Sequence, residues 1–281
     1  MKLKITRRRF ITTSLAVAGG AFVYARWIEP RHLTVTRRTI TLPRLPSALD
    51  GIVIAQLTDL HHQPDVHDAL MAEAIDLVNR ENPHIIALTG DYITKETNVF
   101  SPLMAHLQNL RAQHAIYAVA GNHDRWHGDL TTFQSSFRQA GFDFLLNQGS
   151  LLEILGEKLF IAGTDSVWGG SADPSATMQG HREEPVIALV HEPDYFDTMQ
   201  ANHRLDLQLS GHTHGGQCRV PLIGYAPVGV RYGRKYVYGE FQQNNSRLFV
   251  SRGLGTVGYP VRFACAPEVA FLTLRSGKAE I

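Results

Sequence analysis

The 281-residue sequence has only two cysteines, Cys218 and Cys265, too few for a disulfide framework. The sequence leaves open whether the two cysteines form one disulfide bridge or remain free thiols. The sequence also lacks solenoid-type repeats and low-complexity segments. Because 44% of its residues are hydrophobic, the chain can bury a full core as one large domain or at most two small ones.

The chain as a whole also has no excess of one charge, because its formal net charge is +1. The charges are nevertheless unevenly distributed along the sequence. Residues 1–40 carry nine Lys and Arg and a single acid, Glu29. Subtracting these from the 27 basic and 26 acidic residues of the whole chain leaves 18 and 25, a net charge of −7 for the remainder. Proteins bind nucleic acids mainly through Lys and Arg, so we expect no nucleic-acid partner for the body of the chain.

The apolar run nearest the N-terminus, Ile11–Ala25, is diluted by Thr, Ser and Gly and is short of the roughly 20 apolar residues that span a membrane. The segment before it, Thr6-Arg7-Arg8-Arg9-Phe10-Ile11, resembles a twin-arginine export signal. Residues 1–30 are therefore predicted to be a twin-arginine-type signal or a membrane anchor. The predicted partners are the twin-arginine translocase and a membrane surface, and the predicted location is the cell envelope. A basic disordered tail is the alternative.

Five short apolar runs are the main feature that the sequence does contain, and each leads into Asp, Asn or His. The runs are Ile52–Leu57, Ile85–Leu88, Ala115–Ala120, Val186–Val190 and Leu205–Leu209. Runs of this length and composition predict buried strands. Because α/β proteins present their chemistry at the carboxyl ends of strands, we expect the polar residues after the five runs to form one site.

The polar residues after these runs form a set that could bind metal. They provide two carboxylates, one amide oxygen and four imidazoles: Asp59, His61, Asp91, Asn122, His191, His212 and His214. Seven ligands exceed what one transition ion takes but suit two ions that share a carboxylate. The mixed oxygen and nitrogen set favours Mn, Fe, Zn or Co over Ca or Mg. A structural zinc cage is not expected, because no cysteine lies in these motifs.

Helices are predicted between the strands of the first part, and strands dominate the second part. The predicted helices run from Asp65, as N-cap, to about Asn79, then over Ser101–Gln113 and Leu130–Ala140. Further strands are predicted at Leu33–Leu42, Leu151–Leu155, Lys158–Ala162, Lys235–Phe241, Arg247–Ser251 and Glu268–Leu274. This order predicts an α/β fold with two packed mixed β-sheets flanked by helices, a four-layer sandwich over residues 31–281.

Several residues near the motifs leave two interpretations open. Residues 164–183 are predicted to form a surface loop near the site, with Trp168 either exposed or packed over the edge of the sandwich. Arg252 and Arg262 could contact a substrate phosphate or form ordinary salt bridges. Most remaining histidines are taken as solvated or structural, but His62 and His127 are worth testing because they lie beside predicted ligands.

The five motifs, in this order, resemble the calcineurin-like metallophosphoesterase family over roughly residues 50–275. The family pattern is D-x-H, G-D, G-N-H-D/E, a single His and G-H-x-H. The matching residues are Asp59-Leu60-His61, Gly90-Asp91, Gly121-Asn122-His123-Asp124, His191 and Gly211-His212-Thr213-His214. The leader, the continuation Gly215-Gly216-Gln217 and the later Ser251-Arg252-Gly253-Leu254-Gly255 resemble the bacterial YaeI-like subgroup most.

The resemblance implies a phosphohydrolase that cleaves phosphodiester or pyrophosphate bonds with a hydroxide that bridges two divalent metal ions. It implies that one ion is held by Asp59, His61, Asp91 and His214. It assigns the other ion to Asp91, Asn122, His191 and His212. It further implies that His123 steadies the transition state or protonates the leaving oxygen, with Asp124 orienting the ring of His123.

The substrate stays open at this point, and no substrate-binding residues are predicted. Some members of the family cleave the pyrophosphate bond of UDP-2,3-diacylglucosamine in lipid A synthesis, and a retained leader would hold the site near such a nucleotide-lipid. Export would instead separate the domain from nucleotide-linked lipid and favour a cell-envelope phosphodiesterase. A non-catalytic metal-binding scaffold is an alternative of another class, but every ligand position of the pattern is filled.

Overall fold

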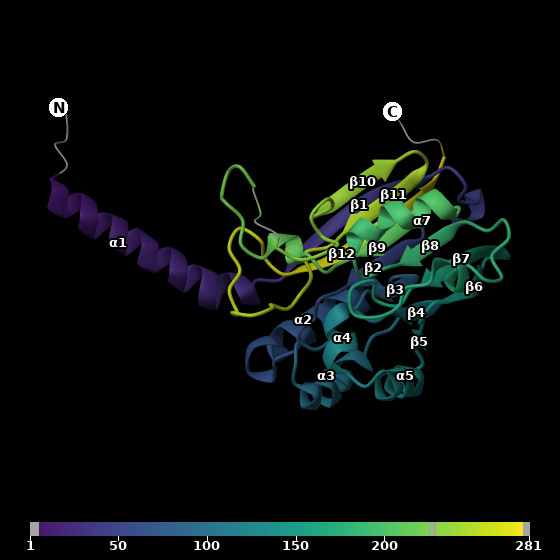
Figure 1. Ribbon diagram of the computed structural model, residues 1–281, viewed down its shortest axis with the longest axis horizontal. Coiled ribbons are helices and arrows are strands. Elements are labelled where there is room, and N and C mark those ends of the chain that lie inside the picture. Colours follow the sequence, from purple (N-terminus) through teal and green to yellow (C-terminus); the bar gives the residue numbers. More distant parts are fainter. Residues whose placement is uncertain (1–5, 225, 227–228, 278–281) are drawn as a thin grey trace.

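A computed structural model describes residues 6–224, 226 and 229–277 of the chain. The first helix, α1 (Arg7–Val23), projects away from the body, and none of its residues is buried in the described chain (Figure 1). The short helices η1 (Tyr24–Ile28) and η2 (Glu29–Arg31) join it to the body. Among the described helices, none combines the length and apolar character needed to cross a bilayer.

Two six-stranded sheets form the centre of the body. The first sheet has the order β1 (Thr34–Leu42), β12 (Glu268–Ser276), β2 (Val53–Leu57), β3 (Ile85–Leu88), β4 (Ala115–Ala118) and β5 (Asp143–Phe144). The second has the order β10 (Gly239–Gln243), β11 (Ser246–Val250), β9 (Leu207–Ser210), β8 (Val186–Leu189), β7 (Glu157–Gly163) and β6 (Gln148–Ile154). Each sheet combines parallel and antiparallel pairs, as the sequence predicts.

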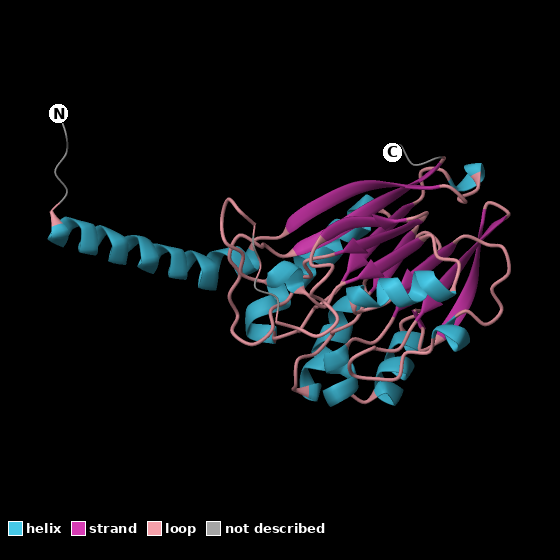
Figure 2. Cartoon of the chain, turned by 45° about the horizontal axis from the view of Figure 1, so that its top comes forward, coloured by secondary structure: helices cyan, strands magenta, loops and turns pink. Residues whose placement is uncertain are grey.

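Helices cover the outer faces of both sheets (Figure 2). Those of the first part are α2 (Pro64–Glu81), α3 (Phe100–Leu107), α4 (Asn122–His127) and α5 (Leu130–Gln139), and those of the second part are α6 (Pro174–Thr177) and α7 (Phe196–Asn202). One apolar cluster lies between the sheets, where Ile54 and Tyr117 of the first sheet join Ile187 of the second. Two further clusters lie under the helices. The predicted four-layer α/β sandwich is confirmed.

Three predicted element boundaries are wrong, each for a local reason. The second helix begins at Pro64 with Gln63 as N-cap, so Asp65 lies in its first turn, and proline is well suited to that first position. Helix α3 ends at Leu107 rather than at residue 113, because the side-chain amide of Asn109 donates to the Ala105 carbonyl, 2.8 Å away, and so satisfies the helix end.

The strand predicted over Lys235–Phe241 begins only at Gly239. The backbone N–H groups of Lys235 and Tyr236 donate instead to the carboxylate of Asp194, at 3.1 Å each. A backbone donor that is satisfied by a side chain cannot also take part in a sheet ladder. Residues 235–238 alternate in polarity like a strand, but their backbone is hydrogen-bonded to the segment after β8 instead of to a neighbouring strand.

Candidate functional site

The five predicted motifs meet at the carboxyl ends of parallel strands in the two sheets: β2, β3 and β4 in one, β8 and β9 in the other. Five of the motif residues have positive φ angles, and none of them is glycine: Asp59 (51°), His61 (38°), Asp91 (56°), His212 (73°) and His214 (51°). This left-handed conformation is uncommon for such residues and clusters at functional sites. It turns their side chains sharply as the chain leaves each strand.

Two motif glycines allow these turns to approach the carboxylates closely. A Cβ atom on Gly121 would lie 2.2 Å from Asp91 Oδ1, and one on Gly211 would lie 2.3 Å from Asp59 Oδ2. Both positions therefore exclude any larger residue without movement of a carboxylate. The backbone N–H groups that follow these glycines also bind the carboxylates, since His123 N donates to Asp91 Oδ1 at 2.9 Å and His212 N donates to Asp59 Oδ1 at 2.8 Å.

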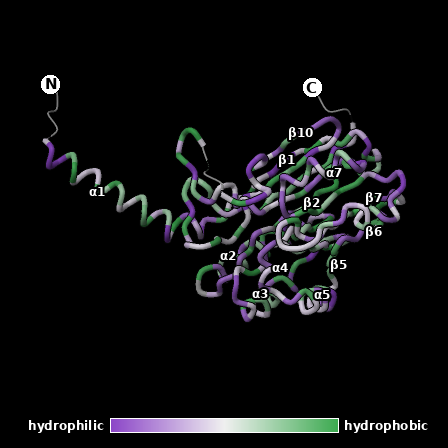
Figure 3. Tube along the Cα trace, viewed as in Figure 1, coloured by the Kyte–Doolittle hydropathy of each residue, from purple (hydrophilic) through white to green (hydrophobic). Residues whose placement is uncertain are grey.

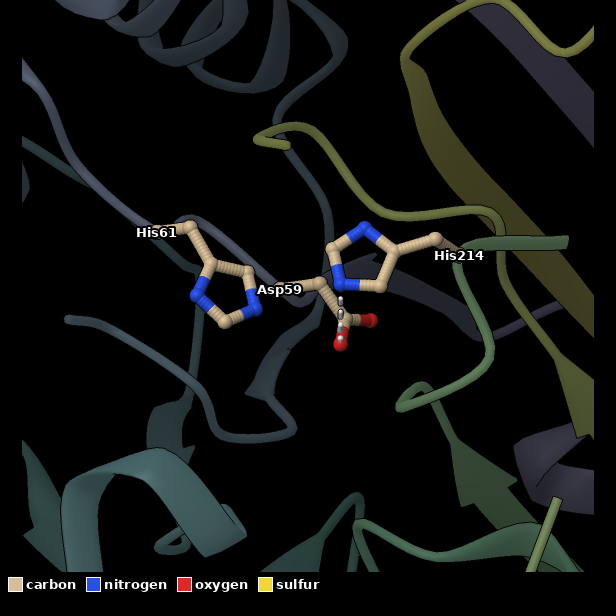
Figure 4. A group of neighbouring side chains, drawn as sticks. All are labelled: Asp59, His61 and His214. Carbon is tan, nitrogen blue, oxygen red and sulfur yellow. Dashed lines mark ion pairs between the residues drawn. The ribbon is translucent and has the colours of Figure 1, made fainter. Parts of the chain in front are cut away.

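The predicted ligands gather into two neighbouring buried groups. In one group, His214 Nε2 lies 3.5 Å from Asp59 Oδ1, and His61 is beside them (Figure 4). In the other, His191 Nε2 lies 3.2 Å from Asp91 Oδ2, with His212 adjacent. His61 Nε2 is 3.3 Å from the same oxygen of Asp91, which connects the groups. Asn122, buried next to His123, completes the set of seven.

Second partners orient the imidazole rings. His191 Nδ1 donates to the Thr89 carbonyl at 2.7 Å, and His212 Nε2 donates to the Arg231 carbonyl at 2.7 Å. A carbonyl only accepts, so these bonds fix the tautomers and leave the opposite ring nitrogens as lone-pair donors. His61 Nδ1 contacts Thr94 Oγ1 at 3.0 Å, which likewise directs its Nε2 into the site.

The unsatisfied atoms of the site fit bound cations. In the described part of the chain, three buried ligand atoms have no hydrogen-bond partner: His61 Nε2, Asn122 Oδ1 and His191 Nε2. Buried polar atoms without partners are rare in proteins. Each of these atoms can offer a lone pair, and together with two carboxylates they form an oxygen and nitrogen set of the kind that binds divalent metal ions.

The ionisable groups of the site are strongly coupled. Burial alone would raise the pKa of Asp91, but the charge of His191 and the close imidazole of His61 hold that pKa well below its usual range. Burial alone would lower the pKa of His191, but the Asp91 and Asp59 carboxylates raise that pKa well above its usual range. Burial raises the pKa of Asp59, and Asp91 adds to that rise. Protonated His191 must therefore lose its proton when a cation binds.

His123 lies beside the ligand groups, with its ring 4.9 Å from that of His61. The family resemblance implies that Asp124 orients this ring, but the structure gives that role to another residue. His123 Nδ1 donates to the Thr94 carbonyl at 2.9 Å. The bond leaves Nε2 free to exchange a proton or to donate to a substrate oxygen.

Asp124 instead holds together the backbone of two motifs. Its buried carboxylate accepts from the N–H groups of Gly121 (2.9 Å), Asp91 (2.8 Å), Tyr92 (2.9 Å) and Ile93 (3.3 Å). Burial and the nearby Asp91 charge raise the pKa of Asp124 to about 7. Asp124 therefore fixes the position of Asp91 relative to the G-N-H-D turn and does not touch the ring of His123.

Aromatic side chains line the site on the side of His123. Trp126 is 41% exposed and its ring lies 5.2 Å from His123, while Trp168 packs edge-to-face on Trp126 (4.7 Å) and on His212 (5.7 Å). Trp168 is thus partly buried and packed rather than free in solvent. The carboxylate of Glu192 holds its loop by accepting from the Trp168 N–H at 3.1 Å.

The structure shows the surroundings of the residues whose roles the sequence left open. Arg252 pairs with Glu268 at 2.8 Å, and Arg262 is fully buried with its guanidinium directed at backbone carbonyls, including that of Cys265 at 2.9 Å. The geometry therefore favours structural roles for both arginines over phosphate binding. In the described chain Cys218 and Cys265 are free thiols. His127 is exposed on α4, next to Trp126.

Sequence reasoning missed Thr94 and Glu192. Thr94 contacts His61 through its hydroxyl and His123 through its carbonyl, but no motif marks a threonine three residues after Asp91. Glu192 directly follows His191, yet its role of holding the Trp168 loop depends on a segment about 25 residues earlier in the chain. Only the adjacency of Glu192 to a predicted ligand could have drawn attention to it.

Comparisons with known proteins agree with this geometry. Residues 52–216 match the family model for calcineurin-like phosphoesterases. The chain is 31% identical to the metallophosphoesterase YkuE of Bacillus subtilis, over 97% of this chain and 99% of the relative. It is 31% identical to the phosphodiesterase YaeI of Escherichia coli, over 96% and 99%. It is 26% identical to the UDP-2,3-diacylglucosamine pyrophosphatase LpxG of Chlamydia trachomatis, over 93% and 95%.

Proposed function

The chain belongs to the calcineurin-like phosphoesterase family and is a metallophosphoesterase, and from this premise we propose that it hydrolyses a phosphodiester or pyrophosphate bond with two divalent transition ions. One observation carries the proposal. Six of the predicted ligands, spread from position 59 to position 214, lie in neighbouring buried groups of potential metal ligands, and the Nε2 atoms of His61 and His191 have no hydrogen-bond partner among the described residues. The name of the relative from Escherichia coli supports diester cleavage.

Each residue has a distinct part in the proposed reaction. Asp59, His61, Asp91 and His214 would hold one ion, and Asp91, Asn122, His191 and His212 the other. Two such ions would activate a water molecule and neutralise the charge that builds on the phosphoryl oxygens. His123, held by Thr94, donates a hydrogen bond or a proton to the leaving oxygen through Nε2. Asp124 is a positioning residue, because its carboxylate binds only backbone amides in the described structure.

The proposal is tested with the Asp91→Asn variant, since the proposal assigns the Asp91 carboxylate to both ions. We expect hydrolysis of bis-p-nitrophenyl phosphate in the presence of Mn²⁺ to be abolished while the protein stays folded. A matched control is Asp129→Asn, which changes an exposed helix cap outside the motifs. Full activity of Asp91→Asn would refute the assignment of a shared ligand.

A second candidate substrate is a nucleotide-linked lipid, as the name of the Chlamydia trachomatis relative suggests. Exposed apolar residues near the site favour a lipid. The loop that follows His214 carries exposed Leu222 and Ile223, and the neighbouring loop carries exposed Tyr259. Hydrophobic stretches are visible along the chain in Figure 3. Gln217 ties the two loops together by donating to the Val257 carbonyl at 3.1 Å.

We also propose that the N-terminal segment holds these loops at a membrane, as a retained twin-arginine-type leader. Helix α1 leaves the body at the end where both loops lie (Figure 1). The junction is tied to them, because Arg262 N donates to the Ala25 carbonyl at 2.9 Å and Tyr24 packs on Phe263. Exposed Phe10, Leu15 and Phe22 on α1 would add to the apolar contact.

The two substrates and the location are distinguished in separate assays. We expect full-length protein to bind vesicles of anionic phospholipid, and Leu222→Asp with Ile223→Asp to weaken binding without loss of activity on bis-p-nitrophenyl phosphate. Unchanged vesicle binding would exclude the loops as the contact. Fractionation of cells that carry a tag after Ile281 then determines the side of the membrane. An outward-facing domain would exclude the nucleotide-lipid substrate and leave the envelope phosphodiesterase.

A further inference from the structure

A third group of potential metal ligands lies outside the site described above: His62, Asp68 and His106. His62 follows His61 in the loop after β2, Asp68 is in the second turn of α2, and His106 is in the last turn of α3. We propose that these three side chains bind a third divalent ion of the zinc class. The ion would connect α2 and α3 to the loop that carries Asp59 and His61.

The distances within the group are those of metal ligands. Both imidazoles direct Nε2 at the same oxygen, Asp68 Oδ1, at 3.2 Å from His62 and 3.3 Å from His106. A charge-assisted hydrogen bond is usually shorter, at about 2.7–2.9 Å. Two atoms bound tetrahedrally to Zn²⁺ at about 2.0–2.1 Å are separated by about 3.3–3.4 Å.

The candidate dinuclear site of the same molecule provides an internal reference. There, His61 and His191 place Nε2 at 3.3 and 3.2 Å from Asp91 Oδ2. The spacing in the third group is the same, although its residues come from different elements. The third group thus has the dimensions of the ligand sets that the family motifs assemble.

His62 gives an independent reason to place a cation here. Its side chain is 1% exposed, and neither of its ring nitrogens has a hydrogen-bond partner among the described residues. Its Nε2 approaches Asp68 closely but without hydrogen-bond geometry. A buried imidazole in this state loses its hydration without compensation, whereas a bound cation would accept the Nε2 lone pair.

The surroundings allow an ion to enter and indicate its class. The side chain of Asp68 is 50% exposed and that of His106 is 27% exposed, so solvent reaches the group and water can complete the coordination. Two imidazoles and one carboxylate suit Zn²⁺, Co²⁺ or Ni²⁺ better than Ca²⁺ or Mg²⁺. An ion held in this way would join α2, α3 and the loop after β2 at one point, where His106 already contacts Asp68.

The test counts ions by mass spectrometry in full-length protein that has been stripped with chelator, equilibrated with Zn²⁺ and desalted. We expect three Zn²⁺ per wild-type chain and one fewer in His106→Ala. Asp68→Asn should lose the same ion. The matched control is His114→Ala, an exposed histidine that stacks on His84 and belongs to none of the ligand groups found among the described residues; it should keep three.

The outcomes separate this inference from the proposed function. Equal zinc content in wild type and His106→Ala would overturn the third site, whatever the total. The same conclusion follows if His114→Ala loses as much zinc as His106→Ala, because binding would then be unspecific. If the dinuclear site failed and the third site held, wild type would carry one Zn²⁺, and His106→Ala would remove it.

Discussion

His123 is the residue whose position most directly indicates a chemical role. It lies among the ligand groups, but its Nδ1 donates to the Thr94 carbonyl and its Nε2 points away from that bond. The ring therefore has a fixed tautomer and one nitrogen for exchange with substrate. A ring nitrogen of His123 also lies within 4.8 Å of ligand atoms of His61 and Asp91, but the proposal gives His123 no ligand role, so metal binding should not depend on it.

We predict that His123→Ala lowers kcat by about 10²–10⁴-fold, the usual range for a lost general acid, while the content of bound metal stays unchanged. Steady-state kinetics on bis-p-nitrophenyl phosphate and metal analysis of the same preparation measure both quantities. His127→Ala, on the exposed end of the same helix, is the control and should leave kcat unchanged. Parallel loss of metal and activity in His123→Ala would make His123 a ligand rather than a proton donor.

At the residue scale the sequence marks residues that the structure brings together, but it does not mark the hydrogen-bond partners of those residues. Asp59, Asp91 and His214 are marked by their motifs, because each follows an apolar run and a turn. The roles of Asp124 and Thr94 are not marked, since they depend on backbone groups of other motifs. A hydrogen bond from a backbone N–H of residue 91 to a carboxylate at 124 leaves no pattern in the sequence.

At the scale of elements, the strand ends of the two sheets must meet within van der Waals distance at the site. Gly211, after β9, makes this possible, since a Cβ there would lie 2.1 Å from Thr58 Oγ1 and 2.3 Å from Asp59 Oδ2. Both neighbours are buried, and they come from the other sheet. Any side chain at this position displaces the turn after β2.

We therefore predict that Gly211→Ala weakens metal binding by about tenfold or more and lowers activity in proportion, as expected when a ligand is shifted by about 1 Å. Metal titration of the stripped variant measures the change. The control is Gly229→Ala, whose added Cβ meets no described atom within 4 Å. Wild-type affinity in Gly211→Ala would show that the contact between the strand ends tolerates movement.

The aromatic rim is a second arrangement at this scale, made by Trp126 of α4 and Trp168 of the loop after β7. Because it adjoins His123, it should contact the leaving group of a diester. We predict that Trp126→Ala raises KM for an aryl diester several-fold with little change in kcat, since an exposed aromatic contact contributes about 0.5–1.5 kcal/mol. A fall in kcat at constant KM would assign Trp126 to the chemistry instead.

Element prediction from sequence succeeds for the apolar strands and fails at polar helix ends and loops. The runs before Asp59 and Asp91 are predicted almost to the residue, because a buried strand requires an uninterrupted apolar segment. Helix α4 is not predicted, because the polar composition of Asn122–His127 is typical of a turn. The helix forms where the Asp124 carboxylate binds the surrounding backbone amides. Local composition does not contain that tertiary contact.

At the scale of the whole molecule, Glu268 joins the two sheets. It begins β12 in the first sheet, and its carboxylate accepts from Ser251 Oγ (3.0 Å), just after β11 of the second sheet, and from Arg252. Burial would raise its pKa, but Arg252 and the hydrogen bond from Thr36 hold the pKa below its ordinary value of 4.5. The ionised form is therefore favoured by folding.

We predict that Glu268→Gln lowers the free energy of unfolding by about 3–5 kcal/mol, because it leaves the largely buried Arg252 without a counter-charge. A carboxylate with a depressed native pKa stabilises the fold above its unfolded pKa, and this contribution disappears as the pH falls through the native pKa. Denaturant unfolding should thus show wild type losing stability below about pH 4.5, whereas Glu268→Gln loses less. Identical pH profiles would contradict the assignment.

The predicted boundary of the leader at residue 30 crosses a segment that packs on the body. Glu29 is buried, and its carboxylate accepts from the backbone N–H groups of Ala264, at 3.0 Å, and Cys265. Cys265 in turn contacts the carbonyl of His214 through its sulfur at 3.2 Å. The junction between α1 and the body is thus linked to a predicted metal ligand, a connection that hydropathy and motif spacing do not reveal.

The central claim is that bound cations between the two sheets carry the reaction. The most direct measurement is hydrolysis of bis-p-nitrophenyl phosphate by full-length protein, first stripped with chelator and then titrated with Mn²⁺. The account predicts no activity in stripped protein and a rise that saturates once the dinuclear site is filled. Undiminished hydrolysis by the stripped protein would contradict it.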